Sequence, residues 1–297
     1  MIISVSRRTD IPAFFSDWFL RRVEQGYFCA KNPFNPSQVQ RVSLEPGDVD
    51  AFVFFSKDPR PLMRHLARLD ASGFHYYFQF TLNAYDATLE PSVPPLEQRI
   101  RAFQELGATI GPSRVVWRYD PVIISSGTGR EYHVRSLASI ARRLEGYTER
   151  LIISFLDFYP RVRVRLERLE AQGLTFADIA APCNADTLYH LASEISAIGA
   201  RHGMRVQTCC EKVDLDLMGI EHGSCIDSAL IERLFGAVPG IPRDRNQRPG
   251  CLCAQSVDMG AYNTCSHGCV YCYANSSAAS KKANLARHRP DSPFLVG

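Results

Sequence analysis

The chain has 297 residues, of which 45% are hydrophobic and 22% charged, and this composition excludes a disordered or fibrous protein. Its 34 Lys and Arg against 31 Asp and Glu leave a net charge of +3, too small to imply a protein-wide attraction to nucleic acid or membrane. No apolar run approaches the roughly 18 residues of a membrane-spanning helix, and the N-terminal apolar stretch is too short for a signal peptide. We therefore expect a cytoplasmic protein without a membrane partner.

Six short stretches rich in β-branched and aromatic residues predict strands, and helical patterns alternate with them. The predicted strands are 2–6, 51–56, 76–82, 115–119, 151–156 and 204–209, and the predicted helices are 13–25, 60–70, 95–107, 131–145, 161–172, 185–202 and a last one near 228–235. Apolar strands that alternate with helices predict an α/β fold with a parallel sheet covered on both faces. Six βα units fit either an open barrel or a doubly wound sheet, and we expect a partial (βα)6 TIM-like barrel over residues 1–235.

The amino-acid composition of the chain changes after residue 235. Residues 236–250 hold three prolines and three glycines and predict a linker or an ordered loop. A cysteine-rich segment follows, so 236–275 is the predicted linker and cluster-binding module. Residues 276–297 are polar without a strong period and predict a frayed end or a wrap over the surface.

Polar residues follow nearly every predicted strand, at the edge where parallel α/β folds bind ligands. Arg7 and Arg8 follow the first strand and either grip a carboxylate or phosphate or lie in an exposed loop. Arg118 lies inside an apolar strand, so its charge needs a partner such as Asp120, Asp157 or a ligand. Arg7, Arg8, Arg118 and Asp120 are therefore the candidates for handling the substrate.

Cysteine is the unusual component: there are ten, and five of them lie between Cys251 and Cys272. In a reducing compartment, clustered cysteines indicate metal binding or catalysis rather than disulfides. The sharpest pattern is Cys265-Ser-His-Gly-Cys269-Val-Tyr-Cys272, because three thiolates at this spacing can bind a [4Fe–4S] cluster and leave one iron open. His267, inside this loop, could be a ligand, but its position between two cysteines favours a place on the loop surface or a role in proton handling.

This spacing, with an aromatic residue before the third cysteine, resembles the motif of radical S-adenosylmethionine enzymes. The resemblance implies that Cys265, Cys269 and Cys272 bind the cluster, that Tyr271 packs near the adenine and that Asn275 belongs to the cofactor site. In that superfamily the open iron chelates S-adenosylmethionine, and reduction of the cluster yields a 5′-deoxyadenosyl radical. The resemblance also implies an electron donor such as a flavodoxin or ferredoxin, and the superfamily's partial barrel matches the six predicted units.

Over nearly its full length the chain is similar to a bacterial family, a domain of unknown function whose C-terminal cysteines have been likened to the cluster motif of the radical enzymes. This similarity supplies no substrate, small or macromolecular. The matching stretches are 6–12, 117–121, 225–227, 246–248, 251–253, 258–260 and 262–275.

A second group of cysteines lies upstream of the main motif. Cys251, Cys253, Cys210 and Cys225 could hold an auxiliary cluster or a Zn²⁺ ion and so tie the C-terminal module to the barrel. Cys209 ends an apolar strand, where a free cysteine is often simply buried. We expect Cys29 and Cys183 to be structural.

Three functions compete. The first, which we expect, is a radical S-adenosylmethionine-like enzyme acting on a polar or anionic substrate. The second is a non-radical [4Fe–4S] protein for electron transfer or Lewis-acid chemistry. Two departures from the superfamily support it. The superfamily's motif normally follows the first strand but here lies near the C-terminus, and the superfamily often has a Gly-Gly-Glu stretch at its second strand, whereas this chain has no Gly-Gly pair. The third is a zinc-stapled module that binds nucleic acid through a basic run. The run comprises Arg161, Arg163, Arg165 and Arg168, which a solvated helix face also explains.

Overall fold

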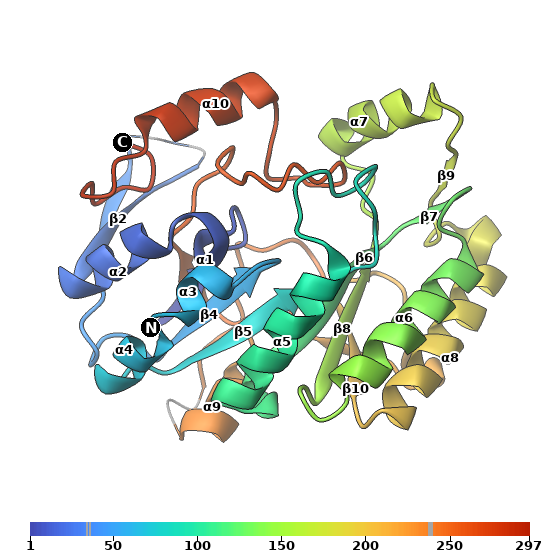
Figure 1. Cartoon of the computed structure of the whole chain (residues 1–297), viewed down its shortest axis with the longest axis horizontal. Helices are drawn as coiled ribbons and strands as arrows, with labels where there is room; N and C mark the ends of the chain where they lie inside the picture. The colour runs from blue at the N-terminus through green and yellow to red at the C-terminus, as the bar shows by residue number, and fades with distance from the viewer. Residues whose placement is uncertain (34, 36, 237–239) are drawn as a thin grey trace.

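The computed structural model describes residues 1–33, 35, 37–236 and 240–297. The protein has a mixed α/β fold around an eight-stranded sheet in which every neighbouring pair is parallel (Figure 1). In sheet order the strands are β11 (Glu221–Gly223), β10 (Arg205–Cys209), β8 (Arg150–Phe155), β6 (Val115–Val122), β5 (Tyr76–Thr81), β4 (Ala51–Ser56), β1 (Ile2–Val5) and β12 (Ser256–Asp258). Within the described ranges, the two edge strands do not pair with each other, so the sheet is open.

The predicted α/β class with a parallel sheet is confirmed, and each of the six predicted strands is present. From β1 to β10 the strands are neighbours in the order in which the chain visits them, and the late strand β12 returns to pair with β1. The three-residue strands β11 and β12 were not predicted, because they are too short to show a periodic pattern.

Helices connect the strands as predicted, although two of the expected helices are divided. The segment 13–25 forms α1 and α2, and the segment 60–70 forms α3 and α4. The helices are α1 (Ile11–Phe14), α2 (Ser16–Glu24), α3 (Arg60–Met63), α4 (Leu66–Ala71), α5 (Leu96–Ile110), α6 (Arg130–Leu144), α7 (Pro160–Glu170), α8 (Ala185–Arg201), α9 (Ser228–Phe235) and α10 (Ala278–Arg287). No helix in the described part of the chain is both long and apolar enough to cross a membrane.

Two small antiparallel ladders and three turns of 3₁₀ helix complete the described structure. The ladders are β2 (Tyr27–Lys31) with β3 (Val39–Ser43), and β7 (Ile124–Ser125) with β9 (Phe176–Ala177); the 3₁₀ turns are Pro112–Arg114, Pro182–Asn184 and Asp216–Met218. The predicted linker at 236–250 includes residues 237–239, which lie outside the described residues.

The C-terminal segment is ordered against the N-terminal part of the molecule. Ser277 caps α10 by accepting a hydrogen bond from the Ser280 amide. Beyond the helix, the Trp18 indole donates to the Ser292 carbonyl at 2.9 Å, and the Cys29 amide donates to the Pro293 carbonyl at 2.8 Å. Residues 292–293 thus lie against α2 and β2.

Both faces of the sheet are buried because successive side chains of a strand point to opposite sides. On one face Phe52, Phe54 and Trp117 pack against α2, α5, α6 and α8. On the other, Val53 and Tyr77 pack against α9 and the segment 251–254. This double burial explains why the strands are apolar throughout.

Candidate functional site

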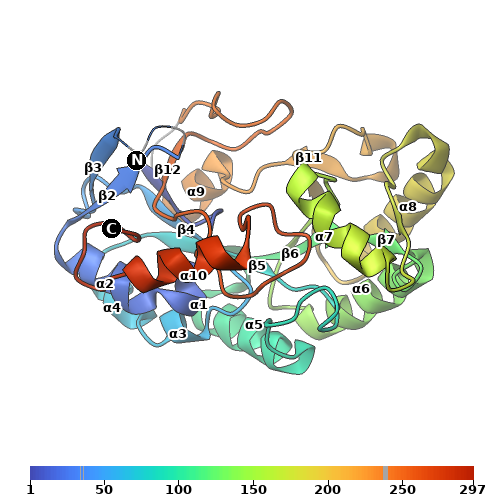
Figure 2. The ribbon, with the colours of Figure 1, turned by 90° about the horizontal axis from the view of Figure 1, so that it is seen from above.

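The cysteine motif lies at the carboxyl end of the sheet. Strand β12 runs parallel to β1 and ends at Asp258, so the chain leaves the sheet on the side where β1 also ends. Figure 2, which looks down on this end of the molecule, shows α10 and α7 lying across it. We call residues 265–272 the rim loop.

Asp258 anchors the segment that leads into the rim loop. Its carboxylate accepts hydrogen bonds from the Ser4 and Ser6 hydroxyls at 3.0 and 2.7 Å, and from the Arg7 and Gly260 amides at 2.9 Å each. A Cβ at Gly260 would lie 1.9 Å from the Ser6 Oγ, so only glycine allows this close approach. These hydrogen bonds therefore fasten the segment before the rim loop to the end of β1.

The three cysteines of the rim loop are gathered into one partly buried region. Burial, together with Glu90 and Cys272, raises the pKa of Cys269 to about 12 against the opposing effect of Lys57. Burial also raises the pKa of Cys265, and the charges of Asp10, Cys272 and Cys269 affect it further, so the three sulfurs lie within electrostatic reach of one another. The Ala274 amide donates to the Cys272 sulfur at 3.3 Å.

Among the described residues, no three His, Cys, Asp or Glu side chains are placed to hold one ion. In a [4Fe–4S] cluster each cysteine binds a different iron, so the sulfurs need not converge on one point.

His267 is buried, and the expected position on the loop surface is wrong. Its side chain is 3% exposed and its Nε2 lies 2.8 Å from the Asp10 carboxylate. Asp10 also accepts from the Ser56 hydroxyl and the Lys57 amide, at 2.8 Å each, while it caps α1 through the Ala13 amide. One buried carboxylate thus joins the rim loop to the ends of β1 and β4.

Tyr271 belongs to a second polar network under the rim loop. Its hydroxyl donates to the Glu90 carboxylate and accepts from the Lys57 ammonium at 2.9 Å and the Asn83 amide at 3.2 Å. Lys57 and Glu90 form an ion pair at 2.8 Å, and Arg99 lies 3.5 Å from the other Glu90 oxygen. Lys57 and Asn83 are among the polar residues that follow the predicted strands, whereas sequence reasoning missed Glu90, which lies in a loop without a motif.

Asn275 and Arg165 hold the far side of the rim loop. The Asn275 side-chain amide donates to the Cys265 carbonyl at 2.9 Å. Arg165, on α7, donates to the Cys272 and Asn275 carbonyls, the latter at 2.8 Å. The other arginines of the basic run, Arg161, Arg163 and Arg168, are exposed to solvent.

The four candidate substrate residues do not form one cluster. Arg118 pairs with Asp120, whose carboxylate also accepts from Ser154. Burial alone would raise the pKa of Asp120, but Arg118 and Ser154 outweigh it and lower the pKa. Arg7 faces Asp258 at 3.7 Å, whereas the Arg8 guanidinium lies over the Tyr262 ring. The two adjacent arginines therefore do not clamp one ligand.

The upstream cysteines gather on the face of the sheet that α9 and the segment 251–254 cover, which we call the inner face. Cys225, Cys251 and Cys253 are buried in one cluster, with Cys209 and Cys210 packed against it. Cys29 and Cys183 lie elsewhere, in the β2–β3 hairpin and just before α8. All ten cysteines are free thiols in the described structure.

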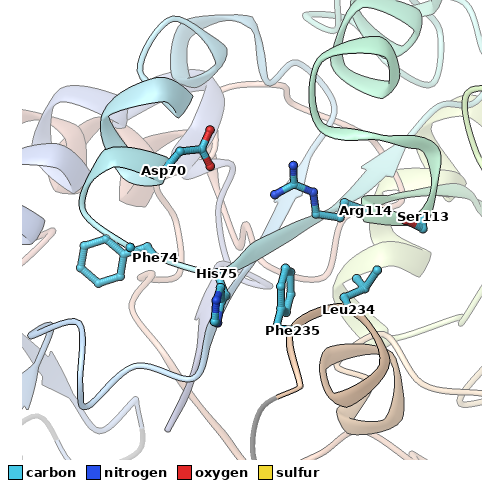
Figure 3. A pocket seen from close by; sticks show the side chains of 8 residues that line it. Asp70, Phe74, His75, Ser113, Arg114, Leu234 and Phe235 are labelled. Carbon is cyan, nitrogen blue, oxygen red and sulfur yellow. The ribbon is translucent and has the colours of Figure 1, made fainter.

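A hollow of about 460 Å³ lies at the opposite end of the sheet, where β5 and β6 begin (Figure 3). His75 stacks on Phe235 beside it, with ring centroids 4.6 Å apart, and Arg114 and Asp70 also line it. A second hollow, of about 340 Å³, lies between α2, α4 and the β3 end. Neither hollow is lined by a cysteine.

A family model described as a domain of unknown function (DUF1848) matches residues 2–274. The chain belongs to this family. No curated protein matches the sequence. Among solved structures, the crystal structure of a putative α-L-fucosidase from Bacteroides thetaiotaomicron VPI-5482 is similar with a TM-score of 0.32 and 10% identity, over 74% of this chain and 78% of that one. A similarity of this size carries no weight for fold or function.

Proposed function

We propose that this protein is a radical S-adenosylmethionine-like enzyme that binds a [4Fe–4S] cluster through Cys265, Cys269 and Cys272 and acts on a polar or anionic substrate. The observation that carries the proposal is the position of β12, which directly precedes the rim loop and pairs in parallel with β1. In the radical superfamily the cysteine motif follows the first strand. Here the motif comes late in the sequence, yet it follows the edge strand beside β1.

The strand order supports the finer expectation of a partial TIM-like barrel. Consecutive parallel strands that are joined by right-handed crossovers place their helices on one face of the sheet, and α2, α5, α6 and α8 share one apolar core with that face. The other face holds α9 and the cysteine-rich segment. In this interpretation the substrate would bind at the carboxyl end, beneath the rim loop.

The residues of the rim loop fit the cluster by their donor chemistry. Three thiols lie in one loop, an amide already donates to the Cys272 sulfur, and amide donors to sulfur stabilise anionic clusters. Lys57 lies near Cys269 and would offset the negative charge. Among the described residues, the buried Asn275 Oδ1 and Thr9 Oγ1 have no hydrogen-bond partner, so both are available to a ligand.

When bound and reduced, the cluster would supply the electron that cleaves S-adenosylmethionine. The protein's own residues would position the reactants. Asp10 binds His267, and Tyr271 binds Glu90, so both contacts hold the rim loop in place. Near the carboxyl ends of β6 and β8, the Arg118–Asp120 pair and Ser154 would contact the substrate. Because the charges of Arg118 and Asp120 offset each other, this pair would orient polar groups of a substrate rather than neutralise an anion.

The proposal is tested by reconstituting the full chain with iron and sulfide without oxygen. We expect about four irons for the rim site and release of 5′-deoxyadenosine when dithionite and S-adenosylmethionine are added. Replacing all three rim cysteines by serine should abolish the product, whereas the matched Cys29→Ser/Cys183→Ser variant should retain it. A reducible rim cluster that never cleaves S-adenosylmethionine would overturn the radical assignment.

A non-radical [4Fe–4S] protein is the second candidate, because the superfamily often has a Gly-Gly-Glu stretch at its second strand and this chain has no Gly-Gly pair. Low-temperature EPR of the reduced protein separates the two. A spectrum that changes when S-adenosylmethionine is added supports the radical enzyme, and an unchanged spectrum supports the second candidate. The nucleic-acid module is disfavoured because Arg165, in the middle of the basic run, is engaged with the rim loop.

A further inference from the structure

Four cysteines from three separate segments meet on the inner face of the sheet. Cys209 ends β10, Cys225 precedes α9, and Cys251 and Cys253 precede β12. Cys225 and Cys253 are each 3% exposed and Cys251 is 6% exposed. Cys225, Cys251 and Cys253 belong to one buried cluster, and Cys209 packs against it. We call these four residues the inner thiol group. Cys209 takes the place expected for Cys210, whose thiol is instead directed at the Pro249 carbonyl, 3.8 Å away.

We propose that the inner thiol group binds a second metal centre through thiolate sulfur. The proposal goes beyond the function of the rim loop and does not depend on it. Both a zinc ion and an iron–sulfur cluster share this ligand chemistry, since each binds deprotonated cysteine.

Two N–H donors are directed at sulfurs of the group. The Arg118 Nη1 donates to the Cys225 sulfur at 2.7 Å, and the Ile226 amide donates to the Cys253 sulfur at 3.5 Å. A neutral thiol is a weak acceptor, whereas metal-bound thiolates are regularly stabilised by such donors. The Arg7 guanidinium also lies within electrostatic reach of Cys253 and Cys225, so two cations face the group.

The simpler explanation is that these cysteines are small hydrophobic residues of the core. That explanation accounts for their burial beside Ile226 and Val53. Asp120 already offsets the charge of the buried Arg118 guanidinium, but the simpler explanation gives no partner of that kind to its Nη1, which is directed at the Cys225 sulfur. A negative centre made of several thiolates would be such a partner, in addition to Asp120.

Binding of a single ion requires the side chains to rearrange. Within the described ranges the sulfurs do not converge on one point, so a zinc ion would need the thiols to rotate inward. A cluster would not need the sulfurs to meet at one point, because each sulfur binds a different iron. In either case the centre would tie β10, the start of α9 and the segment before β12 together, and so stabilise the edge that carries the rim loop.

The test separates this centre from the rim site by starting from the full chain with Cys265, Cys269 and Cys272 all replaced by serine. After oxygen-free incubation with zinc, or with iron and sulfide, we expect one metal centre per chain by elemental and sulfide analysis. Zinc without sulfide identifies an ion, and iron with sulfide identifies a cluster; both support the proposal. Adding Cys225→Ser and Cys253→Ser should remove the metal completely, whereas adding Cys29→Ser and Cys183→Ser should leave it unchanged.

Native mass spectrometry of the variant without the three rim cysteines tests the proposal even if the variants with further substitutions do not fold. A mass increment of one zinc ion or one iron–sulfur cluster supports the proposal. A folded chain, by circular dichroism, that carries no increment after both incubations overturns it. Failure of the radical reaction with metal still bound at the inner thiol group would contradict only the proposed function.

Discussion

The two ends of the sheet differ in what they hold. At the carboxyl end, buried carboxylates and cations connect the rim loop to the strand ends through Asp10, Asp258, Lys57 and Glu90. At the amino end lies the hollow of about 460 Å³ beside His75 and Phe235. The lining of the hollow includes Asp70, His75 and Arg114 but no cysteine, whereas the carboxyl end holds the thiols of the rim loop and the buried Lys57–Glu90 pair.

The comparison shows that the size of a hollow does not locate the chemistry of this molecule. In parallel α/β folds the loops after the strands meet at one end and supply reactive side chains, while the other end contributes to stability. Buried charges are costly unless they are paired, so a fold retains them where they serve a site. The following changes test whether the two ends really differ in this way.

The largest effect is expected for Lys57→Met at the carboxyl end. Glu90 is 1% exposed on its side chain, and without Lys57 it would keep only Arg99, at 3.5 Å, as a cationic neighbour. Breaking a buried ion pair costs about 3 kcal/mol or more, and urea denaturation should detect this loss in the free energy of unfolding. The exposed Lys282→Met should change it by less than about 0.5 kcal/mol. Equal stability of Lys57→Met and the wild type would refute the network.

A pH-dependent effect is expected at Glu211, next to the ends of β8 and β10. Burial, with Asp157 and Asp120, raises the pKa of Glu211 to about 7, although the Phe155 amide and Arg248 oppose the rise. Because the folded pKa exceeds the ordinary value of 4.5, its contribution to stability is fully present below that value and is lost as the pH rises through 7. The contribution is at most about 3 kcal/mol.

Glu211→Gln should therefore flatten the dependence of stability on pH. Between pH 5 and 8 the wild type should lose up to about 2 kcal/mol more than the variant, as measured by urea denaturation at several pH values. Glu232→Gln on α9, whose side chain is exposed, serves as the control. Parallel curves for Glu211→Gln and the wild type would show that Glu211 titrates normally.

A smaller effect is expected for Asp10→Asn. The asparagine keeps the shape but removes the charge that faces His267, and one of its side-chain atoms becomes a donor where Asp10 accepts from Ser56 and Lys57. We expect a loss of about 2 kcal/mol in unfolding free energy and reduced loading of the rim loop with iron. Asp17→Asn, exposed in the first turn of α2, should cost only a few tenths of a kcal/mol. Full iron loading in Asp10→Asn would separate His267 from the site.

The central strands could be predicted from the sequence because each is apolar on both faces. In β4, Val53 packs toward α9 and Phe54 toward the outer helices, so the run carries a strong local signal. Strand β12 has no such signal. It pairs with β1 through contacts such as Ser4 with Asp258, which are 254 residues apart, and a single sequence does not encode such a pairing visibly.

In the candidate site, too, the local features could be predicted from the sequence and the long-range contacts could not. The spacing of Cys265, Cys269 and Cys272 is local and was visible at once. The partners that hold the loop were not, because Glu90 meets Tyr271 across 181 residues and Asp10 meets His267 across 257. His267 was expected at the loop surface since it lies between two cysteines, but the Phe14 ring covers it with centroids 4.7 Å apart.

The smallest effect is expected at the amino end. His75→Ala removes the ring that stacks on Phe235, and an aromatic pair of this kind contributes about 1 kcal/mol. The variant should lose no more than this in unfolding free energy and should bind as much iron and sulfide as the wild type, because its ring lies among the residues of the hollow and not among those of the rim loop or the inner thiol group. Metal analysis on the same preparation used for denaturation checks both statements. If His75→Ala lost metal or product while remaining folded, the hollow would be coupled to the cysteine sites. The claim that only the carboxyl end of the sheet serves the chemistry would then be wrong.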